Sequence, residues 1–262
     1  MKILIAVFSC SSDIEKGHNR VIRETWGKNL PPNVDLRFLI GTAQPGPISE
    51  EDPAWQADFK GYSARKPWLL APPPPLIDPL LLDELELDVP DGYFYLTHKA
   101  RAAFRWAVER NYDYVFRCDT DTFIRIPQLL ASGFEEHDYV GRRLGPAPGY
   151  AYGGPSMGLS NKALRILADA PITITADDVW VGETLKQHGI LLHDDRRYCH
   201  LGKRAPDAIT MHLSTKSGIY DNRRMISMYR TPFPETTGGP SPNSVEVIVQ
   251  GRHLWIRKPQ GK

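Results

Sequence analysis

Cysteine is scarce in this chain of 262 residues, which has only Cys10, Cys118 and Cys199. Three cysteines cannot all pair, and none lies in a C-x-x-C spacing, so the sequence indicates neither a disulfide framework nor a cysteine zinc site. The chain also lacks an N-x-S/T glycosylation site. These absences favour a reducing compartment, and we expect a cytoplasmic protein.

The sequence also lacks an excess of either charge, because 32 Lys and Arg residues face 31 Asp and Glu residues. A broad positive field for nucleic acid or anionic lipid is therefore excluded. No apolar run approaches the ~20 residues of a membrane span, so "MKILIAVFSCSS" indicates a first core strand, with a secretory signal peptide as the alternative. The absence of G-x-G-x-x-G excludes the dinucleotide-binding fingerprint.

Hydrophobic residues make up 41% of the chain, enough for a sizeable core. Apolar runs at Ile3–Ser9 and Val34–Gly41 predict buried parallel strands, and the helical spacing between them predicts a helix that ends at Gly27. This β-α-β opening is typical of an α/β protein with a Rossmann-like, mostly parallel sheet flanked by helices. We expect one domain, residues 1–262.

Proline and acidic residues interrupt the pattern and predict an insertion at about 44–87, with a short helix at Asp78–Leu85. After it come a helix over "YLTHKARAAFRWAVERN", a strand over "YDYVFRC", a helix capped by Ser160 and a helix that begins at Asp177. "ILLHDD" and "AITMHLS" are expected as strands, and a hairpin is expected at about 244–258.

The acidic pair Asp119 and Asp121 follows the "YDYVFRC" strand directly. Open α/β sheets bind ligands beyond the carboxyl ends of their strands, so a ligand is expected here. Two converging carboxylates repel unless a cation lies between them, and Mg²⁺ and Mn²⁺ share carboxylate oxygens with substrate phosphates. The pair therefore suggests a metal that neutralises a diphosphate, with a simple Asp-Thr-Asp turn as the alternative.

Six blocks carry a family resemblance: "RVIRETWG", "FLIG", "DVPDGYFYLTHK", "FRCDTDTFI", "GGPSMGLS" and "DDVWVG". In order and rough spacing they resemble family 31 glycosyltransferases, which include β1,3-galactosyltransferases, β1,3-N-acetylglucosaminyltransferases and Fringe-like enzymes. The resemblance covers most of the chain except the proline-rich insertion and the tail after Asp221. It implies a GT-A-like fold, a UDP-sugar donor, Mn²⁺ (or Mg²⁺) at a D-x-D motif, and inversion at the anomeric carbon.

Under this resemblance Asp119 and Asp121 match the ends of the family's D-D-D and are expected to bind the metal, while Thr120 replaces the middle Asp. Asp178 matches the Asp of E-D-V and is expected to be the general base, with Asp177 in place of Glu. For both aspartates the alternative is a helix N-terminus that they complement. His212 in "TMHLS" matches a histidine that completes the metal site.

For the donor, the resemblance places Ser9 and Arg20 at the nucleotide, together with Asp119, and lets the backbone at Gly153 and Gly154 approach the donor sugar. Arg20 as a surface charge and the two glycines as a tight turn are the alternatives. Tyr95, Pro155 and Ser156 depart from the family pattern, which leaves the donor sugar open. The cluster "HDDRRYCH" is expected to be structural because strand alternation separates its side chains.

Trp26, Trp106 and Trp180 have the helical spacing of core residues, although Trp180 could line an acceptor cleft. The sequence thus predicts a metal-dependent, inverting hexosyltransferase that moves a sugar from a UDP-sugar to a glycan or glycoconjugate hydroxyl and forms a β1,3 linkage. An inactive carbohydrate- or nucleotide-binding module and a metal-dependent phosphohydrolase are the alternatives.

The family's N-terminal membrane anchor and stem have no counterpart before the first strand. We therefore expect a soluble bacterial or viral protein, or a Golgi-luminal one if the chain is a trimmed piece. Nucleic acid and a membrane span are not expected.

Overall fold

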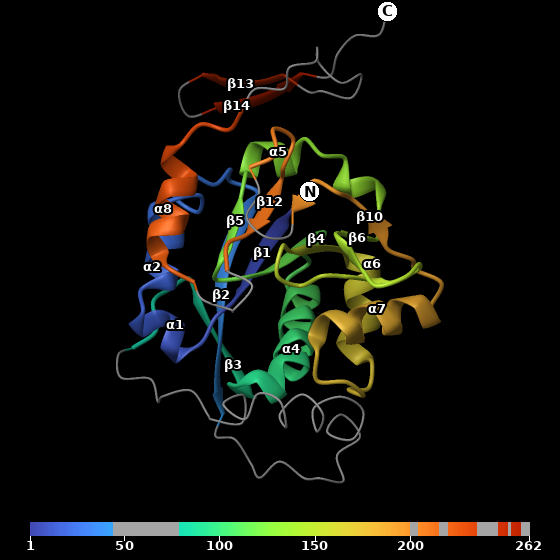
Figure 1. Cartoon of the computed structure of the whole chain (residues 1–262). Helices are drawn as coiled ribbons and strands as arrows, with labels where there is room; N and C mark the ends of the chain where they lie inside the picture. Colours follow the sequence, from blue (N-terminus) through green and yellow to red (C-terminus); the bar gives the residue numbers. More distant parts are fainter. Residues whose placement is uncertain (44–78, 200–203, 215–219, 235–245, 251–252, 258–262) are drawn as a thin grey trace, which may run out of the picture.

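The computed structural model of the chain describes residues 1–43, 79–199, 204–214, 220–234, 246–250 and 253–257 (Figure 1). Its centre is a seven-stranded sheet. The strands in spatial order are β10 (His193–Asp194), β6 (Tyr139–Gly141), β9 (Met157–Ser160), β4 (Tyr114–Asp119), β1 (Ile3–Phe8), β2 (Val34–Ala43) and β3 (Glu84–Pro90).

Only β9 of this sheet runs against its neighbours; the pairs β4–β1, β1–β2, β2–β3 and β6–β10 are parallel. The predicted α/β architecture, a mixed and mostly parallel sheet flanked by helices, is confirmed. Sequence patterning does not reveal β9, because its "MGLS" looks like part of a glycine-rich connection. Gly158 is needed there, since a Cβ at this position would lie 2.8 Å from the Tyr114, Phe116 and Val140 side chains.

Alternation along β1 sends its side chains into two separate cores. Ile3, Ile5 and Val7 face one core, and Leu4, Ala6 and Phe8 face the other. All six β1 residues are buried. Strand β1, inside the sheet, is therefore covered on both faces, as a parallel sheet requires.

Helices cover both faces of the sheet (Figure 1). The Leu4 side holds α4 (Leu96–Glu109), α6 (Asn161–Asp169) and α7 (Asp177–Gln187). The Ile3 side holds α2 (His18–Glu24), α5 (Ile126–Leu130) and α8 (Asn222–Arg230). The short α1 (Ser11–Glu15) follows β1, and single 3-10 turns lie at Tyr93–Tyr95 and Phe134–Glu136.

The helices have the sequence features that predicted them. Ser160 caps α6 by accepting a hydrogen bond from the Ala163 amide, as predicted. The predicted inner face of α4 is buried at Ala100, Ala103 and Phe104. By contrast, α2 ends at Glu24, before the predicted stop at Gly27.

Smaller strand pairs complete the described residues. A second sheet has the order β11 (Tyr198–Cys199), β12 (Thr210–His212) and β5 (Thr122–Ile124). Two hairpin-like pairs are β7 (Arg143–Leu144) with β8 (Tyr150–Ala151), and β13 (Glu246–Gln250) with β14 (His253–Arg257), which falls where the C-terminal hairpin is predicted.

The short helix predicted at Asp78–Leu85 is wrong where the structure describes it. Residues 79–83 are not helical, and Glu84 starts edge strand β3, which pairs with β2. Pairing with the open edge of β2 overrides the helical propensity of the leucines. The Glu84 carboxylate also accepts hydrogen bonds from Asn19 and Arg23 of α2. Most of the predicted proline-rich insertion, residues 44–78, lies outside the described residues.

Among the helices that the structure describes, none combines the length and apolar character needed to cross a bilayer.

Candidate functional site

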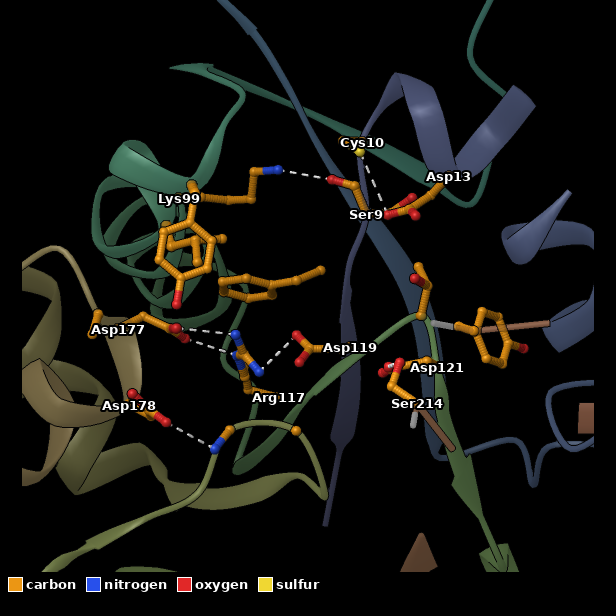
Figure 2. A pocket seen from close by; sticks show the side chains of 18 of the residues that line it. Ser9, Cys10, Asp13, Lys99, Arg117, Asp119, Asp121, Asp177, Asp178 and Ser214 are labelled. Carbon is orange, nitrogen blue, oxygen red and sulfur yellow. Dashed lines mark hydrogen bonds and ion pairs between the residues drawn. The ribbon is translucent and has the colours of Figure 1, made fainter. Parts of the chain in front are cut away.

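A cleft of about 1040 Å³ opens at the carboxyl ends of β1 and β4 (Figure 2). Phe8 of β1 pairs with Asp119 of β4, so both strands end at the same level and their following residues face the same space. The predicted site residues that line this cleft are Ser9, Asp119, Asp121, Gly153, Gly154 and Asp178. The strand-end position therefore places the acidic pair at a cavity, as expected for an open α/β sheet.

His212 comes to the acidic pair through the second sheet. Strand β12 pairs antiparallel with β5, and this register sets His212 opposite Thr122, the residue after Asp121. One ligand atom from each of Asp119, Asp121 and His212 lies within 4.8 Å of the others. The structure thus brings His212 to an acidic pair that lies more than ninety positions earlier in the sequence.

Asp121 is held by two donors. Its Oδ2 accepts a hydrogen bond from His212 Nε2 at 2.8 Å, when the ring is protonated there, and another from the Ser214 hydroxyl. Burial raises the pKa of Asp121, but these hydrogen bonds outweigh it and hold the pKa below its usual value. Burial lowers the pKa of His212, but the Asp121 hydrogen bond together with the charges of Asp121 and Asp119 outweighs burial and raises that pKa. The pair is therefore a charge-assisted contact.

The donor set fits a hard divalent cation. Asp121 Oδ1 is buried and has no hydrogen-bond partner among the residues that the structure describes, so it has a lone pair to offer. The Asp119 side chain is 36% exposed and faces the cleft. Burial raises the pKa of Asp119 and the Asp121 charge adds to this, a repulsion that a cation would relieve. Two carboxylates suit Mg²⁺ or Mn²⁺, and imidazole is the commonest metal ligand among side chains.

Arg117 is a site residue that the sequence pattern does not single out. Its side chain is 3% exposed, and its NH1 lies 2.8 Å from Asp119 Oδ1. On the other side, Nε lies 2.8 Å from Asp177 Oδ2 and NH2 donates to Asp177 Oδ1 at 3.0 Å (Figure 2). Burial lowers the pKa of Arg117, but Asp119 and Asp177 outweigh it, so the guanidinium stays charged. One buried cation thus joins β4 to the start of α7.

Asp178 is the next residue of α7 and lines the cleft. Its Oδ2 accepts a hydrogen bond from the Gly153 amide at 3.1 Å, and its Oδ1 accepts one from the Val179 amide at 2.9 Å. Burial and the neighbouring Asp177 charge raise the pKa of Asp178 to about 6. A carboxylate with a raised pKa in a cleft has the properties of a general base that works near neutral pH.

Gly153 and Gly154 pack tightly between the two groups of charged residues. A Cβ on Gly153 would lie 2.9 Å from Arg117 NH1, and a Cβ on Gly154 would lie 2.8 Å from His212 Nδ1. The Gly154 carbonyl accepts a hydrogen bond from Thr122 Oγ1 at 2.6 Å. The glycines are required by these close contacts within the protein, and the predicted approach to a donor sugar remains a prediction.

The two predicted nucleotide residues lie in different places. Ser9 is buried at the cleft, where its hydroxyl donates to Asn19 Oδ1 at 2.7 Å and its carbonyl accepts a hydrogen bond from Lys99 Nζ at 2.7 Å. Lys99 in turn pairs with buried Asp91. Arg20 is exposed on α2 with its guanidinium beside Gly17, and it does not line the cleft.

Other sequence candidates are structural. Trp180 is fully buried and donates from Nε1 to the Pro171 carbonyl at 2.8 Å, so it does not line an acceptor cleft. In "HDDRRYCH", Arg197 pairs with Asp195 at 2.7 Å, and Asp194 pairs with Arg143 at 3.3 Å. These described residues of the cluster form ion pairs between loops and strands and do not converge on a cation.

No protein-family model matches this chain, and no curated protein matches it. Among solved structures, a protein described as a nucleotide-diphospho-sugar transferase from Desulfovibrio desulfuricans G20 is similar, with 14% identity, a TM-score of 0.40, and coverage of 74% of this chain and 80% of the other.

The glycosyltransferase GlyE of Streptococcus pneumoniae TIGR4 is 10% identical with a TM-score of 0.46; the match covers 89% of this chain and 61% of GlyE. A glycosyltransferase involved in glycosylation of the major capsid of PBCV-1 is 12% identical with a TM-score of 0.44, and the match covers 87% of this chain and 98% of the other.

Proposed function

We propose that this chain is a metal-dependent, inverting glycosyltransferase that moves a hexose from a UDP-sugar to a hydroxyl of a glycan or glycoconjugate and forms a β1,3 linkage. One observation carries the proposal. Asp178, with its raised pKa, lines the same cleft as Asp119 and Asp121, and Arg117 lies between them (Figure 2). His212 lies beside the two aspartates and completes a possible ligand set. An inverting displacement needs such a division between a base and a group that supports the leaving group.

Asp119, Asp121 and His212 are the residues that would hold Mn²⁺ (or Mg²⁺). When bound, the cation supplies positive charge that neutralises the donor diphosphate and stabilises the departing UDP. The protein's own part is to keep the three ligands in place. Ser214 holds the Asp121 carboxylate, and Thr122 Oγ1 ties the start of β5 to the Gly154 carbonyl beside His212.

Asp178 acts as the base on the acceptor side. In its ionised form it accepts the proton of the acceptor hydroxyl as that oxygen attacks the anomeric carbon of the donor sugar. The Gly153 and Val179 amides fix the carboxylate, so its orientation does not depend on the substrate. Attack from the side opposite the departing diphosphate inverts the anomeric configuration.

The nucleotide is proposed to bind at the end of β1. Ser9 lines the cleft there, and the Lys99 hydrogen bond to its carbonyl fixes the backbone at that point. Gly153 and Gly154 also line the cleft, and their backbone is proposed to approach the donor sugar. The six sequence blocks support membership of glycosyltransferase family 31 and a single GT-A-like domain over residues 1–262.

A donor screen tests the proposal. The protein with Mn²⁺ is incubated with UDP-galactose, UDP-glucose, UDP-N-acetylglucosamine and UDP-N-acetylgalactosamine, each with a panel of glycan acceptors, and products are read by mass spectrometry. We expect one donor to add the mass of its own sugar, hexose or N-acetylhexosamine, EDTA to abolish the addition, and proton NMR to show an inverted, β-linked product. Donor binding without turnover would point instead to a binding module, and phosphate release without transfer to a phosphohydrolase.

A further inference from the structure

The cleft lining beside Asp178 includes apolar and aromatic side chains as well as charged ones. Val179 follows Asp178 on α7, and Leu144 and Tyr150 of β7 and β8 line the same cleft. Arg117 and Asp177 supply the charges there. A wall with apolar side chains beside a few polar groups suits a ligand that carries both kinds of group.

Leu144 and Tyr150 form the apolar part of this lining, named here the apolar edge. They are direct partners in the antiparallel pair of β7 and β8, so their side chains share a face. Leu144 is 43% exposed and Tyr150 is partly buried. A single exposed leucine on a surface is ordinary, but this one lines the cleft next to an aromatic ring.

The apolar edge is fixed one helical turn from the proposed base. Asp178 and Gly182 are four residues apart on α7 and lie on one face of the helix, about 6 Å apart along its axis. Gly182 packs directly on β8, since a Cβ there would lie 2.4 Å from the Tyr150 Cβ. The next β8 residue, Ala151, donates its amide hydrogen to Tyr139 Oη at 2.7 Å. The backbone and Cβ of Tyr150 are therefore held beside α7, one helical turn after Asp178.

We propose that the apolar edge binds the acceptor, and that its ligand is a sugar ring packed through its C–H face against Tyr150 and Leu144. A pyranose has apolar C–H groups on its faces and hydroxyls at its rim, so a ring held on an aromatic face presents a hydroxyl sideways. At this position that hydroxyl points along α7 toward Asp178. The inference rests on the proposed function and names the acceptor subsite of the same cleft.

Saturation-transfer NMR tests the subsite without turnover. The probes are the methyl β-glycosides of galactose, glucose, N-acetylglucosamine and xylose, with the protein loaded with UDP and Mn²⁺. We expect at least one glycoside to receive saturation on its ring C–H protons. Tyr150→Ala should weaken its binding about five- to tenfold, Leu144→Ala about two- to threefold, and Tyr150→Phe less than twofold because the ring remains.

Leu191→Ala is the matched control, since Leu191 is an exposed leucine (61%) that does not line the cleft, and its binding should equal that of the unchanged protein. The proposal is overturned if no glycoside binds the unchanged protein, or if Tyr150→Ala and Leu191→Ala bind alike. Failure of the proposed function has a separate signature, namely that the unchanged protein neither binds UDP with Mn²⁺ nor consumes any UDP-sugar.

Discussion

The two groups of carboxylates in the cleft are built in opposite ways. In the first group, Asp119 of β4 and Asp121 just after it lie beside His212 of β12. Hydrogen bonds from His212 and Ser214 stabilise the charged form of Asp121. Asp178 lies on helix α7, accepts hydrogen bonds from the Gly153 and Val179 backbone amides, and has a pKa raised to about 6. The difference fits the two proposed roles, with Asp121 kept ionised for a cation and Asp178 able to exchange a proton.

The largest expected effect comes from breaking the cation group. Asp121→Asn removes a charged ligand while its shape and the His212 and Ser214 neighbours stay. Loss of several kcal/mol of leaving-group stabilisation should lower transfer about 10³- to 10⁵-fold. The measurement is transfer rate against Mn²⁺ concentration, and Ser214→Ala is a milder companion that keeps both carboxylates. Near-normal transfer by Asp121→Asn would contradict the assignment of Asp119, Asp121 and His212 as the metal site.

Removal of the proposed base should lower the transfer rate somewhat less than removal of the Asp121 charge. Asp178→Asn keeps the size of the side chain and an oxygen for the Gly153 amide, but it cannot take a proton at neutral pH. We expect kcat to fall about 10²- to 10⁴-fold with the donor KM changed less than threefold. Steady-state kinetics with varied donor separates the two constants. An unchanged kcat would mean that another group accepts the proton.

Arg117 joins the two groups, and its loss should appear in stability. Arg117→Met leaves Asp177 buried without its cation and should lower the free energy of unfolding by about 3–5 kcal/mol in urea titrations. Arg105→Met is the control, because Arg105 is half-exposed in a 3.8 Å surface ion pair with Asp169; its cost should be below about 1 kcal/mol. Equal losses in the two variants would show that Arg117 has no special role.

The smallest expected effect is a pH dependence of kcat/KM that follows the ionisation of the Asp178 carboxylate. Burial and the Asp177 charge raise the pKa of Asp178, so its base form is lost on acidification: kcat/KM should fall about tenfold per pH unit below about 6 and level off above it. Asp177→Asn removes the neighbouring charge and should move the midpoint to lower pH. A rate that is flat from pH 5 to 8 in the unchanged protein contradicts this.

Much of the fold follows from local sequence. The buried run of β1, the apolar face of α4, the Ser160 cap of α6 and the strand end at Asp119 are all set by patterns within a few residues. Strands β9 and β3 are not, because each owes its place to neighbours far along the chain. From the sequence alone Gly158 is typical of a loop, and only the structure shows that neighbouring side chains leave no room for a Cβ there.

Some residues of the candidate site could likewise be predicted from local sequence, and others could not. Asp119 and Asp121 can be found from their position after a strand, but His212 and Asp178 are indicated only through the family resemblance. Arg117 is not singled out by the sequence pattern, since it sits in a buried strand and one of its two carboxylate partners, Asp177, is sixty residues away. Arg20 shows the limit of the resemblance, because the structure places it outside the cleft.

The division of roles between the two groups is tested most directly by UDP binding. Calorimetric titration of UDP, with and without Mn²⁺, is run on the unchanged protein, Asp121→Asn and Asp178→Asn, beside their transfer rates. The account predicts that Mn²⁺-dependent UDP binding is lost in Asp121→Asn but kept in Asp178→Asn, while transfer is lost in both. Loss of UDP binding in Asp178→Asn, or its retention in Asp121→Asn, would contradict the account.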